Sequence, residues 1–155
     1  MTAPLPFSFS SADVFHNCHL PAMTTPEFIE SGEWAGYFTS NLNMRPGGEP
    51  DFCIPMQGIR FSASVHDEDS ILDLCSSRFF HSTTSPFGPF HFEGKLLRDW
   101  GKMILVQCFH TTGLKIPMQA IFTPFGIVAS FGYGKHRLWM WMWKTEWSAG
   151  RSIDQ

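Results

Sequence analysis

Apolar and polar residues alternate along most of the chain after residue 33, in short runs separated by turns. The run Trp139-Met140-Trp141-Met142-Trp143 is unusual because its odd and even positions are both apolar. A strand sends alternate side chains to opposite faces, so the tryptophans would line one face and the methionines the other. One face can fill the inside of a barrel. The other then needs a cover, from the N-terminal segment or from a second subunit.

The same pattern predicts most of the fold. Strands are expected over 34–40, 55–65, 90–96, 103–110, 115–123, 127–133 and 138–143, while 71–81 suits either a strand or a short helix. The connections are short and hold Gly or Pro, which leaves no room for crossover helices. We therefore expect an all-β protein, an antiparallel up-and-down meander of about eight strands. Closure into a β-barrel would remove its exposed edges.

The N-terminal part differs from the rest of the chain. Residues 1–24 show no clear periodicity and are interpreted as an arm laid over the body. Thr25-Pro26-Glu27 is typical of a helix start, with an N-cap hydroxyl, a first-turn proline and an acid near the positive end of the dipole. Gly32 would end this short helix. We expect an arm and helix over 1–31, a barrel domain over 32–147 and a tail over 148–155.

Composition narrows the classes of function. The chain of 155 residues is 43% hydrophobic and 15% aromatic, and its charged share of 16% is below the roughly 25% typical of globular domains. This apolar surplus must enter a core, a ligand cavity or a subunit interface. A net charge of -3 without a basic run argues against a nucleic-acid partner. The chain shows no signal-peptide pattern and no bilayer-length apolar run, so we expect a cytoplasmic protein with reduced thiols and no membrane partner.

Several segments carry a resemblance to a known family. The Gly32–Tyr37 segment resembles the Gly-x-Trp opening of the lipocalin-like (calycin) β-barrel superfamily, which also follows a short helix. Downstream, the order of Gly88–Gly94, Leu105–Phe109, Phe122–Ile127 and the closing tryptophan strand is similar to fungal F-box-associated calycin-like barrels. The resemblance covers roughly residues 32–147, and we expect no F-box segment before it, because residues 1–30 are too short for one.

The resemblance implies a function class as well as a fold. Stand-alone barrels of the superfamily enclose small apolar ligands, and fungal lipocalin-like barrels include cofactor-free cyclases such as Diels–Alder enzymes. It also implies that a late basic side chain, here Arg137, packs across Trp34 to close one end of the barrel. The matching motifs are turn glycines and packing aromatics, so they bear on fold more than on chemistry.

If the barrel closes, the more apolar face of each strand should point inward. The interior is then aromatic, and the candidate ligand-binding residues are Trp34, Phe38, Phe61, Phe92, Met118, Phe122, Phe131, Trp139 and Trp141. Its few polar groups, Gln57, Gln107 and Tyr133, could hold and polarise a carbonyl. His110 ends a strand and could act at the barrel mouth as a general base. A one-residue slip of this strand would exchange Gln107 for His110, and both glutamines also suit hydrogen-bonded core positions.

These residues favour a cofactor-independent cyclase or isomerase for an apolar small molecule of fungal secondary metabolism, because positioning alone can supply roughly 7–11 kcal/mol. A carrier for the same ligands and a protein-interaction barrel are the alternatives. We expect no cofactor and no metal, since the spacing of His16, Cys18 and His19 matches no strong zinc pattern. The two apolar faces of the last strand favour a homodimer or a tightly docked arm.

Overall fold

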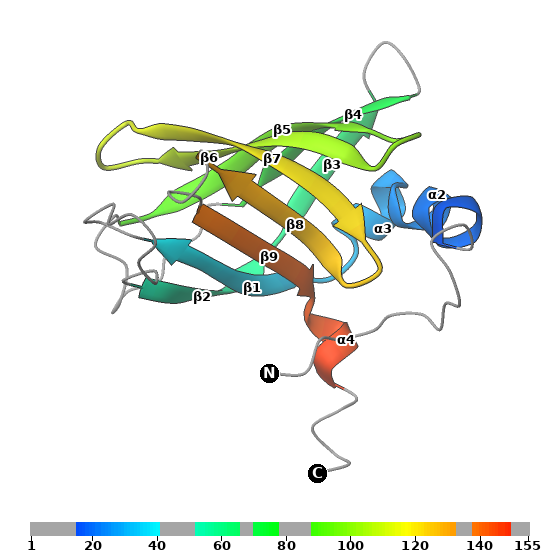
Figure 1. Ribbon diagram of the computed structural model, residues 1–155, viewed down its shortest axis with the longest axis horizontal. Coiled ribbons are helices and arrows are strands. Elements are labelled where there is room, and N and C mark those ends of the chain that lie inside the picture. The colour runs from blue at the N-terminus through cyan, green and yellow to red at the C-terminus, as the bar shows by residue number, and fades with distance from the viewer. Residues whose placement is uncertain (1–14, 41–51, 66–69, 78–87, 133–137, 150–155) are drawn as a thin grey trace.

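The computed structural model describes residues 15–40, 52–65, 70–77, 88–132 and 138–149. Within these ranges, nine strands form one antiparallel sheet in the order β2-β1-β9-β8-β7-β6-β5-β4-β3 (Figure 1). The strands are β1 (Trp34–Ser40), β2 (Phe52–Ile59), β3 (Phe61–Val65), β4 (Ile71–Ser76), β5 (Phe90–Leu97), β6 (Lys102–Phe109), β7 (Lys115–Thr123), β8 (Gly126–Phe131) and β9 (Leu138–Lys144). The all-β, barrel-like fold expected from the alternating pattern is confirmed.

A bend in one continuous segment makes the sheet curl. The two edge strands, β2 and β3, are consecutive in the chain and are separated by Arg60 alone. Because one residue joins them, the two edges of the sheet meet at this corner. Gly58 supplies the bend, since its φ of 69° lies in the left-handed region that favours glycine. Between the pairs Trp34–Ile59 and Gly36–Met56, β2 has one residue more than β1, which is a β-bulge.

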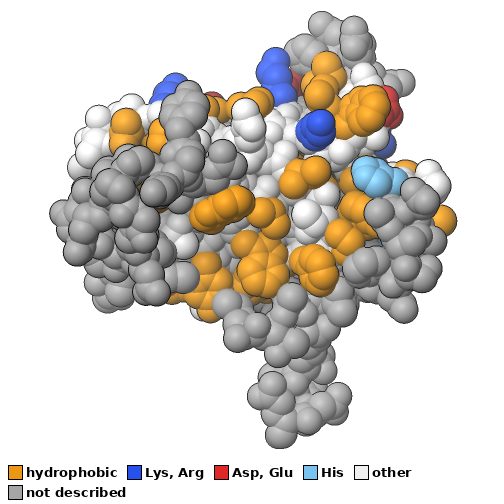
Figure 2. Space-filling view, viewed as in Figure 1, with side chains coloured by type: hydrophobic (Ala, Val, Ile, Leu, Met, Phe, Trp, Pro, Cys, Tyr) orange, Lys and Arg blue, Asp and Glu red, His pale blue; other side chains and the backbone are white. Residues whose placement is uncertain are grey.

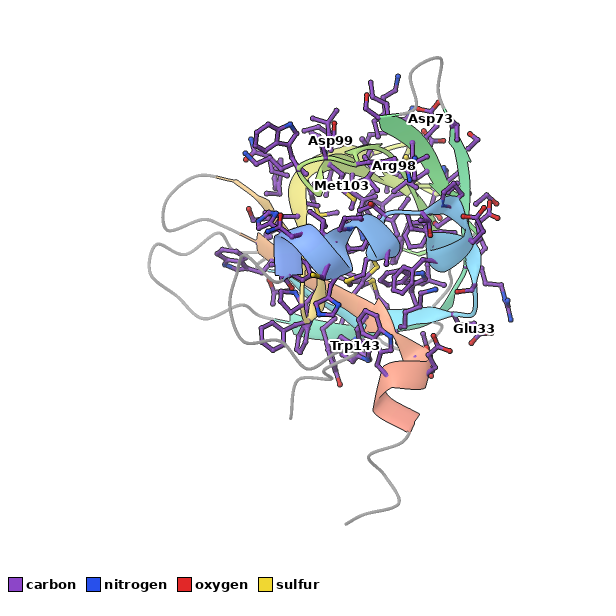
Figure 3. The ribbon with its side chains drawn as sticks, turned by 90° about the vertical axis from the view of Figure 1, so that its right-hand side faces the viewer. Glu33, Asp73, Arg98, Asp99, Met103 and Trp143 are labelled. Carbon is purple, nitrogen blue, oxygen red and sulfur yellow. The ribbon has the colours of Figure 1, made fainter. Side chains whose placement is uncertain are left out.

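Short helices lie across one end of the curled sheet (Figure 3). They are the π-helical turn η1 (Phe15–His19), α2 (Leu20–Met23) and α3 (Pro26–Glu30), and α4 (Thr145–Ala149) follows the last strand. The Thr25 side chain caps α3 by accepting a hydrogen bond from the Phe28 amide, as the sequence predicts. Residues 15–23, part of the segment interpreted as an arm, are helical. Leu20 and Met23 are buried there, because they fill the end of the barrel.

The core lies on the concave side of the sheet. In β9, Met140 and Met142 point inward and are 2% and 0% exposed, whereas Trp139 points outward and is 50% exposed. The ambiguous segment 71–81 forms β4 over residues 71–76, and residues 78–81 lie outside the described part. The predicted strand bounds otherwise agree with the structure to within two residues where it describes them, apart from the division of 55–65 into β2 and β3.

Candidate functional site

The inner face of the sheet holds most of the predicted ligand-binding residues. Those that are buried there are Trp34, Phe38, Phe61, Phe92, Met118 and Phe122. Alternation places Phe131 on the same face as Ile127 and Ala129, but it ends β8 and is 37% exposed. The prediction that an aromatic face points inward is therefore correct for most strands.

The inner aromatic side chains contact one another directly. Phe90 touches both Phe92 and Phe109, with ring centroids 5.4 and 5.6 Å apart. From Phe92 the contacts continue through Phe61, at 6.5 Å, to Trp34, at 5.9 Å from Phe61. These centroid distances are in the range of packed aromatic pairs. The chain's own rings thus fill this part of the interior, which limits the room for a guest molecule.

Gln107 is the polar residue on this face that the sequence singled out correctly. It is 4% exposed, and its Nε2 atom has no hydrogen-bond partner among the residues that the structure describes. A buried amide donor left without a partner costs about 1–3 kcal/mol. Gln107 is therefore destabilising unless a group that is not part of the described chain accepts its hydrogen bond.

Three of the predicted inward residues lie outside the barrel, and a fourth is not among the described residues. Gln57 is exposed, because the bulge at Gly58 reverses the alternation of β2, and the inward prediction for it is wrong. Trp139 and Trp141 are also wrong as interior residues, since the methionines of β9 take the inner face and both tryptophans lie outside. Tyr133 lies outside the described residues.

A buried lysine closes the helix-covered end of the barrel. Lys144 is 0% exposed, and its Nζ donates hydrogen bonds to the carbonyls of Phe28 and Ser31 and to the Ser31 hydroxyl. The ammonium also lies 5.2 Å from the ring centroid of Trp34. Burial lowers the pKa of the Lys144 ammonium. A late basic residue beside Trp34 was expected to be Arg137, which lies outside the described residues.

The outer face of β5 to β9 carries an apolar groove of about 620 Å³. Cross-strand pairing brings its side chains together in two adjacent rows, one containing Leu97, Lys102, Ile121 and Val128 and the other Lys95, Ile104, Gln119, Ser130 and Trp139. The large apolar members are well exposed, with Leu97 at 44%, Ile104 at 52%, Ile121 at 41% and Trp139 at 50%. Figure 2 shows hydrophobic side chains gathered over the strands at the front, β7 to β9.

Two lysines give the groove a positive rim. Lys95 lies 3.9 Å from Asp73, whereas Lys102 forms no ion pair with any residue of the described ranges. Both lysines stand beside Ile104, since Lys95 pairs with Ile104 across the strands and Lys102 precedes it by two positions. The groove therefore combines an apolar floor with a cation that is free to bind an acidic group. The sequence analysis did not predict this groove, although apolar residues at the outward positions of strands 103–110 and 115–123 indicated an apolar outer surface.

A second group of side chains lies on the outer face at the other end of β5 and β6. His91 Nδ1 is 2.6 Å from His110 Nε2, and His91 Nε2 is 3.0 Å from a carboxylate oxygen of Glu93. The hydrogen bond from His91 lowers the pKa of the Glu93 carboxyl, and burial raises the pKa of the neighbouring Cys108 thiol. His110 is exposed on the turn after β6, so it lies on the outside and not in the interior.

Comparisons with protein-family models, with curated proteins and with solved structures find no match for this chain. Among the described residues, none of the helices has the length and apolar character needed to cross a membrane.

Proposed function

We propose that this protein binds a small amphipathic acid, an apolar skeleton with one anionic group, in the outer groove of β5 to β9. The observation that carries the proposal is the combination in one groove of exposed Ile104, Ile121 and Trp139 with the ammonium of Lys102, which forms no ion pair among the described residues. Its volume of about 620 Å³ lies within the roughly 300–1,000 Å³ of small-molecule sites. This is the carrier alternative from the sequence, with the ligand moved to the outside.

The hydrophobic effect and the charge of Lys102 both favour binding of such a ligand in the groove. Leu97, Ile104, Ile121 and Trp139 are each more than 40% exposed, and burying apolar area gains about 25 cal/mol per Å². Lys102 adds electrostatic selectivity for an anion, since an ammonium next to an apolar surface is less screened than one in open water. The apolar part of the ligand should lie along the strand rows, with its acidic end at Lys102.

The test compares two probes with the same chain, dodecanoate and dodecanol. Each is titrated into the protein while the tryptophan fluorescence is followed. We expect dodecanoate to bind more tightly, and Lys102→Gln to remove this preference while dodecanol binding stays the same. Trp139→Phe should abolish most of the fluorescence change. Trp147→Phe should not, because Trp147 packs against Phe28 and Trp34 at the helix-covered end of the barrel and does not line the groove.

A charge placed in the groove gives the decisive variant. Ile104→Glu should weaken dodecanoate binding at least tenfold, about 1.4 kcal/mol. Leu114→Glu is the matched control, because Leu114 is 50% exposed but lies outside the groove. Equal affinities for the two variants would contradict the proposal. Sedimentation adds a second check: a dimer that Ile104→Glu dissociates would mean that another copy of the chain covers this face.

We propose a second candidate from the inner face, the cofactor-free cyclisation expected from the sequence. The supporting observation is the buried Nε2 of Gln107, which has no partner among the described residues and could donate to the carbonyl of a bound polyene. A pericyclic ring closure forms carbon–carbon σ bonds from π bonds, so the product keeps the mass of the substrate. A linear polyene carbonyl compound incubated with the protein alone should yield such an isomer, and Gln107→Leu should slow it. An isomer formed equally fast by that variant would remove Gln107 from the reaction.

A further inference from the structure

The antiparallel pairing of β5 with β6 brings three metal-binding residue types together on the outer face. His91 stands directly opposite Cys108, and Glu93 follows His91 by two positions on the same face. One donor atom from each of the three residues lies within 4.8 Å of the other two. Imidazole nitrogen, thiolate sulfur and carboxylate oxygen are the three protein ligands of Zn²⁺. The three donors come from two rigid, paired strands, which holds them at a fixed spacing.

His91 is already held in a position suited to a ligand. Its Nδ1 forms a hydrogen bond with His110 Nε2 at 2.6 Å, which leaves Nε2 facing Glu93 at 3.0 Å. Histidine ligands in proteins characteristically bond through one ring nitrogen while the other is hydrogen-bonded to a neighbouring group. His110 is such a neighbour, since it fixes the ring plane of His91 and can accept the Nδ1 proton.

The burial of the three donors differs in a way that suits a surface metal site. Cys108 is 5% exposed, the His91 side chain is 22% exposed and the Glu93 side chain is 55% exposed. An ion would therefore approach from the side of Glu93 and meet the thiol at the bottom. Lys115, opposite Cys108 on β7, is the nearby positive group that opposes a cation.

We propose that this protein binds one Zn²⁺ ion through His91 Nε2, the Glu93 carboxylate and Cys108 Sγ, with His110 as the hydrogen-bond partner of His91. Three protein ligands leave the fourth tetrahedral position to water. Zinc binds the lone pair of Nε2 of neutral His91, whose single ring proton sits on Nδ1 and forms the hydrogen bond to His110 Nε2. The Cys108 thiol loses its proton to solvent as the Zn–S bond forms. The proposal does not depend on a ligand in the outer groove.

Cobalt titration is the direct test, because a thiolate bound to Co²⁺ gives an intense charge-transfer band in the near ultraviolet. The full chain, reduced and freed of metal by chelation, is titrated with Co²⁺ and then with Zn²⁺. We expect one equivalent of Co²⁺ to produce the band and one equivalent of Zn²⁺ to remove it. Zinc should also raise the melting temperature, since it binds the folded state. A protein that gives no band and no zinc-dependent stabilisation would overturn the proposal.

Variants assign the ligands. Cys108→Ser should abolish the charge-transfer band, and His91→Ala should weaken zinc binding at least a hundredfold. His110→Ala should weaken it about tenfold, in the range for a group that orients a metal ligand. Lys115→Gln should tighten binding a few fold by removing a positive charge.

A matched cysteine variant separates this site from adventitious metal binding. Cys18 is exposed and lies between His16 and His19 in the sequence, so it is a control thiol with its own neighbouring histidines outside β5 and β6. Cys18→Ser should leave both the cobalt band and the zinc affinity unchanged. Loss of the band in Cys18→Ser with its retention in Cys108→Ser would place the metal elsewhere and refute the assignment. Circular dichroism of each variant confirms that the fold is retained.

Discussion

The inner and outer faces of the same strands both carry large apolar side chains, but only the inner face is buried. Met142 on the inner face is 0% exposed, whereas Trp139, three residues earlier on the outer face, is 50% exposed. The inner face is covered by the curl of the sheet and by Leu20, Met23 and Ile29 from the helices. The described residues leave the outer groove uncovered. Apolar side chains that the fold buries contribute to its stability. An apolar patch that stays exposed indicates a binding site.

The strongest test of this comparison exchanges tryptophan for alanine on each face. Trp34 is 0% exposed, touches Phe61 and Phe122 and donates an indole hydrogen bond to the Ile29 carbonyl. Trp34→Ala should therefore lower the free energy of unfolding by about 3–5 kcal/mol. Trp139→Ala should change it by less than about 1 kcal/mol, because half of that side chain is already in water. Urea denaturation measures both, and similar losses would mean that the faces do not differ as proposed.

The helical cover of the inner face can be tested next. Met23 is 0% exposed at the end of α2, so Met23→Ala should cost about 2–4 kcal/mol. Ala22, its exposed neighbour in the same helix, provides the control, and Ala22→Ser should cost only a few tenths of a kcal/mol. If Met23→Ala were as stable as the wild type, the segment would be dispensable, contrary to the tightly docked arm that the sequence suggested.

One substitution inside the barrel should leave the free energy of unfolding unchanged or raise it. Gln107→Leu removes a buried donor that lacks a partner in the described residues and keeps most of the side-chain volume. Because no hydrogen bond is lost, the variant should be as stable as the wild type or more stable by up to about 1 kcal/mol. Thermal or urea unfolding without ligand gives the answer. A loss above about 1 kcal/mol would show that the amide is satisfied in solution.

The smallest effect concerns the dependence of stability on pH. Burial lowers the pKa of Lys144 below its ordinary value of 10.5, so the unfolded chain binds more protons than the folded chain between the lowered pKa and about 10.5. In that window the free energy of unfolding should rise with pH because of this residue. Below the pKa of the folded state, the free-energy cost of burying the charged Lys144 ammonium does not change with pH. Comparing Lys144→Met with the wild type isolates the contribution, and identical slopes for the two proteins would contradict it.

Local physical chemistry determined the elements and the class of the fold. Alternation with a period of two predicted the strands, because each strand has one face against the core, and glycine and proline marked the turns. The cap at Thr25 was also predictable, since it depends on neighbouring residues alone. The same period identified Trp34, Phe61, Phe92 and Gln107 as inner residues.

Tertiary structure decided which of two equally apolar faces turned inward and which distant residues became neighbours. In Trp139–Trp143 both faces are apolar, so alternation could not choose between tryptophan and methionine. The bulge at Gly58 moved Gln57 outward by a single extra residue in β2. The His91–Cys108 pair and the groove around Ile104 arise from cross-strand register, and Lys144 meets Trp34 through closure of the barrel end. These contacts join residues far apart in the chain, and local patterns carry no information about such distances.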